Sequence, residues 1–398
     1  MAPRVLIIAR QFWPGFCEHD SGLVEIAAGL AEAGSPTTVL TPRWFPELPA
    51  ETNHRGLRIL RLPPPSGRGW GRDPFVRATA GWLKTSAGEL DLAYVSGLRY
   101  DAEAALIASS DGRLFPVLLR PAATGLKGDV YWQLEASGGR RVKARCQRAA
   151  GFVASNRAIE REVIAAGFPR GRIHYIADGV ANMPERNART QADARQALAA
   201  AQPSLGHSGP VAVYVGGLAE EGPSQLAAGW AEIVLRWPDA RLWLVGSGPG
   251  RIELLRMIDE LGLTRHVVLS GTFDTLDEVL TAADVFVSPV ATSSAYAVLQ
   301  AMAAGVPVVA PKSSVMESII TDCQHGLLVP PEEPRALIAA IATLFGQPEL
   351  AGRLAAAARE RAAQQFSLAE TVRRHQALFG RVLAERAADF REKRLSTR

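Results

Sequence analysis

The sequence predicts an α/β fold made of two doubly wound parallel sheets. Apolar runs of strand length alternate with runs of helical periodicity, and this alternation starts afresh after residue 210. Residues 283–310 read as a strand, a turn of small residues, a helix, a glycine and a second strand. Parallel strands joined in this way need a right-handed crossover helix. A chain of 398 residues with 47% hydrophobic content can also bury two cores.

The first series of elements opens with an apolar strand at residues 5–9. A helix with apolar spacing follows at 23–32 and stops at Gly34, and a β-branched strand at 37–41 ends at Pro42. The later elements continue the alternation, with strands at 90–96, 116–120, 151–155 and 173–176 and helices at 102–110 and 157–166.

The segment 178–210 is polar and rich in Ala, Asn and Gln, and it is the predicted domain boundary. The second series then has strands at 211–215, 240–245 and 267–269, helices at 225–237, 251–261 and 276–282, and the unit at 283–310. Helices are predicted at 336–345, 349–365 and 369–386, before a charged tail that we expect to fray.

Composition and charge exclude several classes of protein. A formal net charge of +4 is too weak to indicate nucleic-acid binding without a basic motif. Cys17, Cys146 and Cys323 are far apart and lack metal-ligand spacing, which favours a reduced, cytoplasmic compartment. The first apolar run ends before Arg10, so we expect a strand there, because the run is too short for a signal peptide or a membrane span.

Several short motifs occur in a characteristic order along the chain. They include GLVEIAAGLAEAG in the first series and VAVYVGGL, ARLWLVGSGPG, ADVFVSPV, QAMAAGVPVVAP and HGLLVPP in the second. With these motifs the chain resembles the family-4-type (group 1) glycosyltransferases of the GT-B fold. That resemblance implies two Rossmann-like domains facing across a cleft. Residues 1–185 would form the acceptor-side domain, 186–366 the nucleotide-sugar-binding domain, and 367–398 a helix crossing back to the first domain plus a charged tail.

The resemblance also implies a reaction. Members transfer a sugar from a nucleoside-diphosphate sugar to a glycan or lipid-linked acceptor with retention of anomeric configuration, without a metal or another cofactor. An Arg and a Lys after the first strand of the second domain stabilise the diphosphate. Two glutamates grip the donor sugar and the ribose.

In this sequence those family positions carry other residues. The Arg falls at Gly217, and the Lys falls at Glu221 or is lost in a one-residue deletion, while the glutamates fall at Thr292 and Gln300. The resemblance therefore predicts the following donor-binding residues: Gly217, Gly246, Gly248, Thr292, Ser293, Ser294, Gln300 and Glu317. Ordinary structural roles are the alternative, namely a tight turn for the glycines, a helix N-cap for the serines and a first-turn acid for Glu317.

Losing the cations has a large expected cost, because removing one donor to a developing oxyanion costs about 2.7–4 kcal/mol, or roughly 10²–10³ in rate. Lys312 and Arg120 are the predicted catalytic substitutes, with Lys127 as a further candidate. Each follows the C-terminal end of a predicted strand, where ligands of open α/β sheets bind. The alternative for these residues is an ordinary solvated side chain.

Three hypotheses about function follow. The first is a retaining hexosyltransferase that uses substitute cations. The second is a catalytically silent paralogue that acts as a binding or regulatory partner. The third, a sugar-nucleotide epimerase of the same fold, has no supporting acid/base residues in the sequence.

Two basic clusters in the first series raise the question of a membrane partner. Arg68 and Arg72 flank Trp70, with Phe75, Arg77 and Trp82 close behind. A predicted helix carries Arg140, Arg141, Lys143, Arg145 and Arg148. A peripheral membrane contact is one interpretation, and a solvated loop and helix face is the other.

Overall fold

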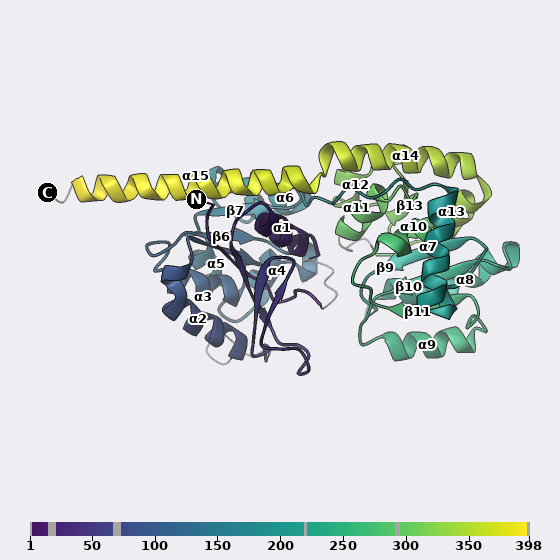
Figure 1. Cartoon of the computed structure of the whole chain (residues 1–398), viewed down its shortest axis with the longest axis horizontal. Helices are drawn as coiled ribbons and strands as arrows, with labels where there is room; N and C mark the ends of the chain where they lie inside the picture. The colour runs from purple at the N-terminus through teal and green to yellow at the C-terminus, as the bar shows by residue number, and fades with distance from the viewer. Residues whose placement is uncertain (1, 15–20, 67–72, 219–220, 291–294, 396–398) are drawn as a thin grey trace. The chain divides into compact units, whose positions relative to one another are not determined.

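The computed structural model describes residues 2–14, 21–66, 73–218, 221–290 and 295–395. The chain forms two compact units (Figure 1). Unit 1 contains the described residues up to Gly179 together with residues from Leu368 onward, and unit 2 contains Val180–Ser367. The sequence had placed these boundaries at 185–186 and 366–367.

Unit 1 is an eight-stranded sheet with helices on both faces. The strand order is β3-β4-β2-β1-β5-β6-β7-β8, and all neighbours are parallel except β3 and β4. Its strands are β1 (Val5–Ile8), β2 (Thr37–Pro42), β3 (Glu51–His54), β4 (Leu57–Leu62), β5 (Leu92–Ser96), β6 (Val117–Arg120), β7 (Gly151–Ala154) and β8 (Ile173–Tyr175). Its helices are α1 (Ser21–Glu32), α2 (Pro74–Ser86), α3 (Tyr100–Ala108), α4 (Asp129–Glu135), α5 (Gly139–Cys146), α6 (Arg157–Ala165) and α15 (Leu368–Leu395).

Unit 2 is a six-stranded parallel sheet in the order β11-β10-β9-β12-β13-β14. Its strands are β9 (Val211–Val215), β10 (Arg241–Val245), β11 (Val267–Gly271), β12 (Val285–Val287), β13 (Val308–Pro311) and β14 (Leu327–Val329). Its helices are α7 (Ala188–Ala201), α8 (Glu221–Arg236), α9 (Arg251–Glu260), α10 (Asp277–Ala282), α11 (Ala295–Ala303), α12 (Met316–Ile319), α13 (Pro334–Gly346) and α14 (Pro348–Gln365). The predicted fold class, two doubly wound parallel sheets, is confirmed.

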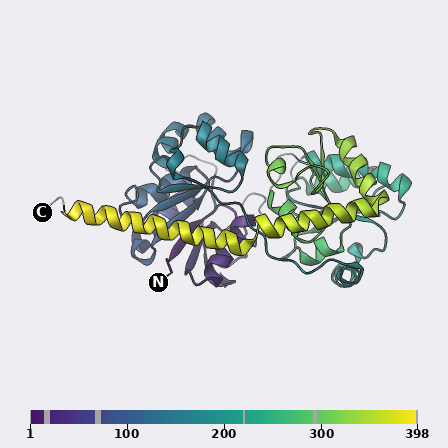
Figure 2. The ribbon, with the colours of Figure 1, turned by 90° about the horizontal axis from the view of Figure 1, so that it is seen from above.

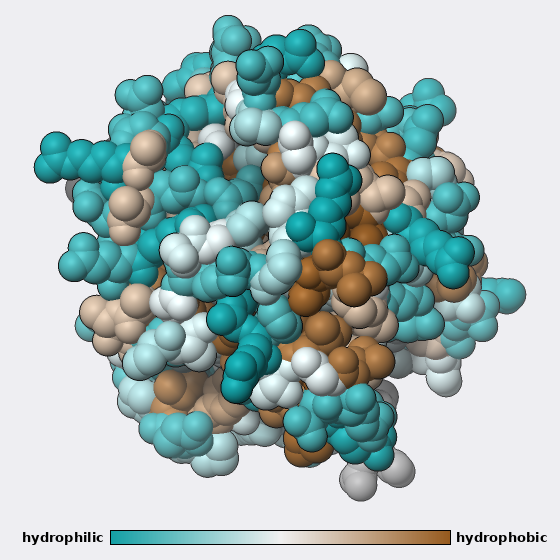
Figure 3. Space-filling view, turned by 90° about the vertical axis from the view of Figure 1, so that its right-hand side faces the viewer, coloured by the Kyte–Doolittle hydropathy of each residue, from teal (hydrophilic) through white to brown (hydrophobic). Residues whose placement is uncertain are grey.

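The central strands are apolar because both of their faces are covered. Every residue of β9 is buried, and its partner β10 is buried from Leu242 to Val245. Such continuous apolar runs are typical of parallel strands between two helical layers. Trp230 of α8 and Trp243 of β10 are both fully buried. The face shown in Figure 3 is mostly polar, with apolar side chains gathered in a band among the polar ones.

The hairpin of β3 and β4 was not predicted from the sequence. β3 is polar and alternates between exposed and half-buried residues, so its four residues give no apolar run. The loop between the strands is Arg55-Gly56, and both residues have positive φ. Two residues of this conformation form the tight turn that matches the twist of a hairpin.

The C-terminal helix α15 belongs to unit 1 and runs along it (Figures 1 and 2). It packs against α1, where Gly29 allows close approach because a Cβ there would lie 2.5 Å from a methyl group of Val372. Phe379 of α15 is fully buried and meets the ring of Tyr94 edge-on. An apolar face of α15 thus completes one core of unit 1.

His375 ties α15 to the sheet by a hydrogen bond as well. Its Nε2 is 3.1 Å from the hydroxyl of Tyr94, and its Nδ1 is 2.8 Å from the carbonyl of Thr371. Because a carbonyl can only accept, Nδ1 carries the proton and Nε2 accepts from the tyrosine. Burial lowers the pKa of His375 to about 4, and the nearby Arg120 acts in the same direction while Asp178 opposes it.

This buried histidine should make the stability of unit 1 depend on pH. The folded-state pKa lies below the unfolded value of about 6.5, so the contribution is complete above that pH and is lost as the pH falls towards 4. Between pH 7 and pH 5 we expect His375 to account for a loss of about 2 kcal/mol in the free energy of unfolding. Urea titrations of wild type and His375→Gln at both pH values measure it. Equal pH dependence in the two proteins would contradict the assignment.

Candidate functional site

The predicted donor-site residues gather at the carboxyl edge of the unit 2 sheet. Because the six strands are parallel, the segments that follow β9, β10, β12 and β13 all emerge at this edge. They bring together Gly217, Gly246, Gly248, Lys312 and Glu317, with Gln300 further along α11. Thr292, Ser293 and Ser294 lie outside the described residues.

Glycines allow the backbones of two loops to approach closely at this edge. The amide of Gly216 donates to Val245, and that of Leu218 donates to Ser247, at 3.0 Å each. Gly246 has a φ of 148°, and a Cβ at this position would overlap the carbonyl oxygen of Gly216. The loop after β9 therefore packs directly on the glycine turn after β10. The structural role predicted for Gly246, a tight turn, is thereby accounted for.

Gln300 lies on α11 with a half-buried side chain, whereas Val298, Leu299 and Ala301 around it are buried. The helix therefore turns these apolar neighbours into the core of unit 2 and leaves Gln300 at the margin. A polar side chain at the margin of the core keeps its amide available to a ligand.

Lys312 directly follows β13, and its side chain is 63% exposed. Its ammonium lies 3.5 Å from a carboxylate oxygen of Glu317. The short helix α12 (Met316–Ile319) follows, with the Ser313 hydroxyl accepting from the amide of Met316. A helix of four residues has few aligned peptide dipoles, so it adds little positive potential for a diphosphate.

The carboxyl edge of unit 2 also carries several acids. Glu221 is in the first turn of α8, where its carboxylate accepts a hydrogen bond from Gln225. Glu332 and Glu333 line a small cavity beside Pro289 and Pro311. Negative charge near the end of β12 opposes the binding of a diphosphate unless cations offset it.

Arg120 does not match its predicted role as a cation for the diphosphate. It is the last residue of β6, with a side chain that is only 1% exposed. One of its guanidinium nitrogens lies 2.9 Å from each carboxylate oxygen of Asp178. Because a buried charge must be paired, this arginine is committed to the structure of unit 1.

A partly buried cluster of charged residues, not predicted from the sequence, lies at the carboxyl edge of the unit 1 sheet. Arg10, two residues after the end of β1, donates to both oxygens of Asp101 in α3 at 2.5 and 3.1 Å and contacts Asp73 at 3.3 Å. Burial raises the pKa of the Asp101 carboxyl, although Arg10 acts in the opposite direction. A charged residue directly after an apolar strand was the available signal, because such positions converge at one edge of a parallel sheet.

Arg251 is a second residue that the sequence analysis missed as a candidate. It begins α9 directly after the glycine turn, and its guanidinium donates to the carbonyl of Leu269 at 3.3 Å. This places a positive charge beside Gly248, whose carbonyl accepts from the Arg251 amide. In the sequence, Arg251 is simply the first residue of a predicted helix, and this position by itself does not indicate a binding role.

The basic clusters of unit 1 are partly neutralised. Arg68, Trp70 and Arg72 lie outside the described residues, and Phe75 is fully buried in the core rather than exposed. On α5 and just after it, ion pairs tie Arg141 to Glu103, and tie Arg145 and Arg148 to Asp111. None of the described helices is long and apolar enough to cross a membrane.

Two family models match the chain, one in each unit. The model described as "Glycosyl transferase 4-like domain" matches residues 21–179, and "Glycosyl transferases group 1" matches residues 209–347.

Curated relatives share part of the sequence. The lipopolysaccharide core biosynthesis glycosyltransferase LpsE of Rhizobium meliloti is 32% identical over 141 residues, which cover 34% of this chain and 40% of that protein. The GDP-mannose-dependent alpha-(1-6)-phosphatidylinositol monomannoside mannosyltransferase of Mycolicibacterium smegmatis is 32% identical over 161 residues, covering 38% and 42%. The chain thus spans about two fifths of the length of these relatives.

Solved structures share the fold over nearly the whole chain. HepE from Anabaena, in complex with UDP and glucose, has a TM-score of 0.75 at 19% identity, covering 95% of this chain and 99% of that one. Sucrose-phosphate synthase from Thermosynechococcus elongatus has a TM-score of 0.75 at 21% identity, covering 96% and 100%. Likeness at these identities establishes the fold.

The close approach at Gly246 predicts a specific cost for adding a methyl group. Gly246→Ala meets both the strain of positive φ and the Gly216 carbonyl, whereas Gly262→Ala meets only the strain, since nothing lies within 4 Å of its Cβ. We expect Gly262→Ala to cost about 1–2 kcal/mol and Gly246→Ala about 1–3 kcal/mol more. Urea unfolding of unit 2 measures both. Equal losses would show that the two loops do not need this approach.

Proposed function

Since the chain belongs to the group 1 glycosyltransferases of the GT-B fold, we propose that it transfers a sugar from a nucleoside-diphosphate sugar to a glycan or lipid-linked acceptor. We further propose that the transfer proceeds with retention and without a metal ion. Both units match family models. The named relatives include a GDP-mannose-dependent mannosyltransferase and a lipopolysaccharide core enzyme, and HepE was solved with UDP and glucose.

The observation that carries the proposal is the pair of loops that meet at Gly216 and Gly246. In an open parallel sheet, ligands bind beyond the carboxyl ends of the strands. Here the two loops pack backbone on backbone, with the Gly216 carbonyl oxygen where a Cβ of Gly246 would lie. We propose that Gly217, Gly246 and Gly248 border the nucleotide, with Gln300 as a hydrogen-bonding partner for hydroxyl groups of the donor.

Lys312 is the cation that we propose for the diphosphate. Its pairing with Glu317 does not prevent this role, since both side chains are about half exposed or more. Exposed ion pairs of this kind contribute only about 0–1 kcal/mol, so the ammonium can leave Glu317 for a diphosphate at little cost. Arg251 is a second cation at the same edge.

A catalytically silent paralogue is the alternative, and one observation favours it. Glu221, in the first turn of α8, stands at the position where the family resemblance expects a lysine, and the buried Arg120 cannot replace that lysine. A protein of this kind would keep the fold and support a partner enzyme.

Titration and turnover distinguish the two functions. We expect wild type to bind a nucleoside diphosphate and to hydrolyse or transfer from its sugar, and Lys312→Ala to lower the rate by about 10²-fold or more, as for the loss of one oxyanion donor. Lys84→Ala, a change of an exposed lysine on α2, is the control and should leave the rate unchanged.

Two results would contradict parts of this proposal. An active wild type with an unimpaired Lys312→Ala variant would exclude the lysine from the donor site. A wild type that neither binds any nucleoside diphosphate in calorimetry nor cleaves its sugar would support the silent paralogue.

We also propose a peripheral membrane contact through exposed residues of the segment 126–140, namely Leu126, Lys127, Tyr131, Leu134 and Arg140. Leu126 and Leu134 are 78% and 66% exposed, and the short helical turn Gly125–Lys127 packs beside α4, which packs beside α5. Exposed apolar side chains beside basic ones fit an anionic lipid surface, to which each basic residue adds about 1 kcal/mol.

Vesicles containing anionic lipid test this contact. We expect the double variant Leu126→Glu, Leu134→Glu to bind at least about 10-fold more weakly, since burying one leucine contributes about 1.5–3 kcal/mol. Leu235→Glu changes a leucine of unit 2 that is 87% exposed, and it serves as the control. Sedimentation with the vesicles measures binding, and equal binding by all three proteins would contradict the proposal.

A further inference from the structure

A cavity of about 420 Å³ opens at the amino edge of the unit 2 sheet. Pro210, Asp284 and Pro307, which directly precede β9, β12 and β13, contribute to its lining. In a parallel sheet this edge is opposite to the carboxyl edge, where the glycine loops meet. The cavity is therefore distinct from the proposed donor site. Its volume lies in the range of pockets that hold small organic molecules.

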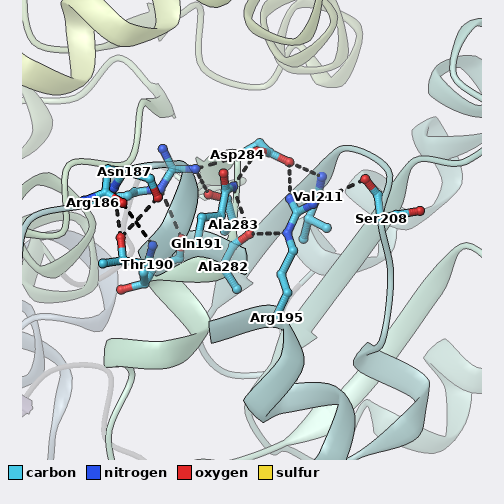
Figure 4. Close-up of polar contacts among 11 residues, drawn as sticks. Arg186, Asn187, Thr190, Gln191, Arg195, Ser208, Val211, Ala282, Ala283 and Asp284 are labelled. Atoms are coloured by element: carbon cyan, nitrogen blue, oxygen red, sulfur yellow. Dashed lines mark hydrogen bonds and ion pairs between the residues drawn. The ribbon is translucent and has the colours of Figure 1, made fainter. Parts of the chain in front are cut away.

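One wall of this cavity is a polar cluster centred on Asp284 (Figure 4). Its carboxylate accepts from Arg195 at 2.7 Å, from Gln191 at 2.7 Å and from the amide of Val211 at 2.8 Å. Arg186 lies 3.6 Å from the other side of the same carboxylate. The two arginines also donate to backbone carbonyls of residues 281–283, which holds their planes in place.

The cluster has an excess of positive charge in a partly buried place. Among the described lining residues, Arg186 and Arg195 contribute two positive charges and Asp284 contributes one negative charge. The arginine side chains are only 19% and 17% exposed. Burial lowers the pKa of Arg186, and the like charge of Arg195 lowers it further, against the opposing effect of Asp284. A single added negative charge would balance the site.

Hydrogen-bonding capacity remains for such a charge. The described hydrogen bonds of Arg186 use Nε and Nη2, and Nη1 takes part in none of them. The Nη1 of Arg195 makes only a long contact of 3.4 Å to the carbonyl of Ser208. A planar carboxylate matches guanidinium donors well, because two oxygens can accept from two N–H groups.

The opposite wall of the cavity is apolar. Leu344 and Phe345 come from the end of α13, and Pro348, Ala351 and Ala355 come from the start and middle of α14. A ligand that fills the cavity must therefore have an apolar face as well as an anionic group.

We propose that this cavity binds a small organic carboxylate, with its carboxylate on Arg186 and Arg195 and an apolar ring against α13 and α14. This site goes beyond the proposed transfer reaction, since it does not involve a nucleotide.

Three probes separate the features of this ligand. 2-Naphthoate carries the ring and the charge, 2-naphthamide carries the ring without the charge, and acetate carries the charge without the ring. We expect calorimetry at low ionic strength to show 2-naphthoate binding at least about 10-fold more tightly than either of the others, because a hydrogen bond to a charged group and the buried ring each contribute at least that factor. Binding should weaken as salt is added.

A pair of glycine variants locates the site without removing any existing contact. Gly352 lines the cavity on α14, and nothing lies within 4 Å of a Cβ built there, so Gly352→Phe projects a ring into open space. Gly380→Phe is the matched control on α15, where a Cβ also meets nothing within 4 Å. Neither change should unfold the protein, since replacing a helical glycine lowers the cost of forming the helix. We expect Gly352→Phe to weaken 2-naphthoate binding by about 10-fold or more and Gly380→Phe to leave it unchanged.

The remaining outcomes overturn the proposal. No binding of 2-naphthoate, equal binding of 2-naphthamide or acetate, or full binding by Gly352→Phe would each exclude this site for a ring carboxylate. Displacement of 2-naphthoate by excess UDP would place the probe in a nucleotide site instead. Because the probes contain no nucleotide, a failure of the transferase proposal leaves these results unaffected.

Discussion

The buried ion pair of Arg120 and Asp178 is the interaction on which the arrangement of unit 1 depends. A guanidinium that is 1% exposed cannot remain charged without a partner, and removing one member of such a pair typically costs about 3–5 kcal/mol. The pair joins the end of β6 to the segment after β8. A Cβ at Gly22 would contact Asp178, so α1 packs closely on it. His375 of α15 lies near the same charges and stays neutral, so its Nε2 can accept from the Tyr94 hydroxyl while its Nδ1 donates to the carbonyl of Thr371.

The pairing of Arg120 with Asp178 limits which cations could bind a diphosphate. A diphosphate leaving group needs cations, yet Arg120 is held by Asp178, and Arg186 and Arg195 lie at the amino edge of the other sheet. At the carboxyl edge of unit 2, the described residues combine Lys312 and Arg251 with several acids. The edge of the sheet at which a cation lies, rather than the total number of cations, therefore decides which anion that cation could meet.

Asp284 has a comparable organising role in unit 2. Its carboxylate connects α7 with the starts of β9 and β12, and through Arg186 it reaches the segment that follows the crossing between the units. Arg359 of α14 anchors the same segment by donating to the carbonyls of Met183 and Pro184. The chain that enters unit 2 is thus fastened to it by side chains that are far away in sequence.

The local sequence pattern was enough to predict the two series of strands and helices. Apolar runs and helical periodicity reflect burial between layers, and both are visible in residues that are neighbours in the sequence. The glycines after β9 and β10 were also visible, since turns demand them. The hairpin of β3 and β4 was not, because a polar edge strand has no apolar run. Only the tertiary structure decided that Arg120 is buried and that Arg10 meets Asp101, ninety-one positions away. Whether a charged side chain is solvated or paired depends on residues that the fold brings together, and its sequence neighbours do not reveal them.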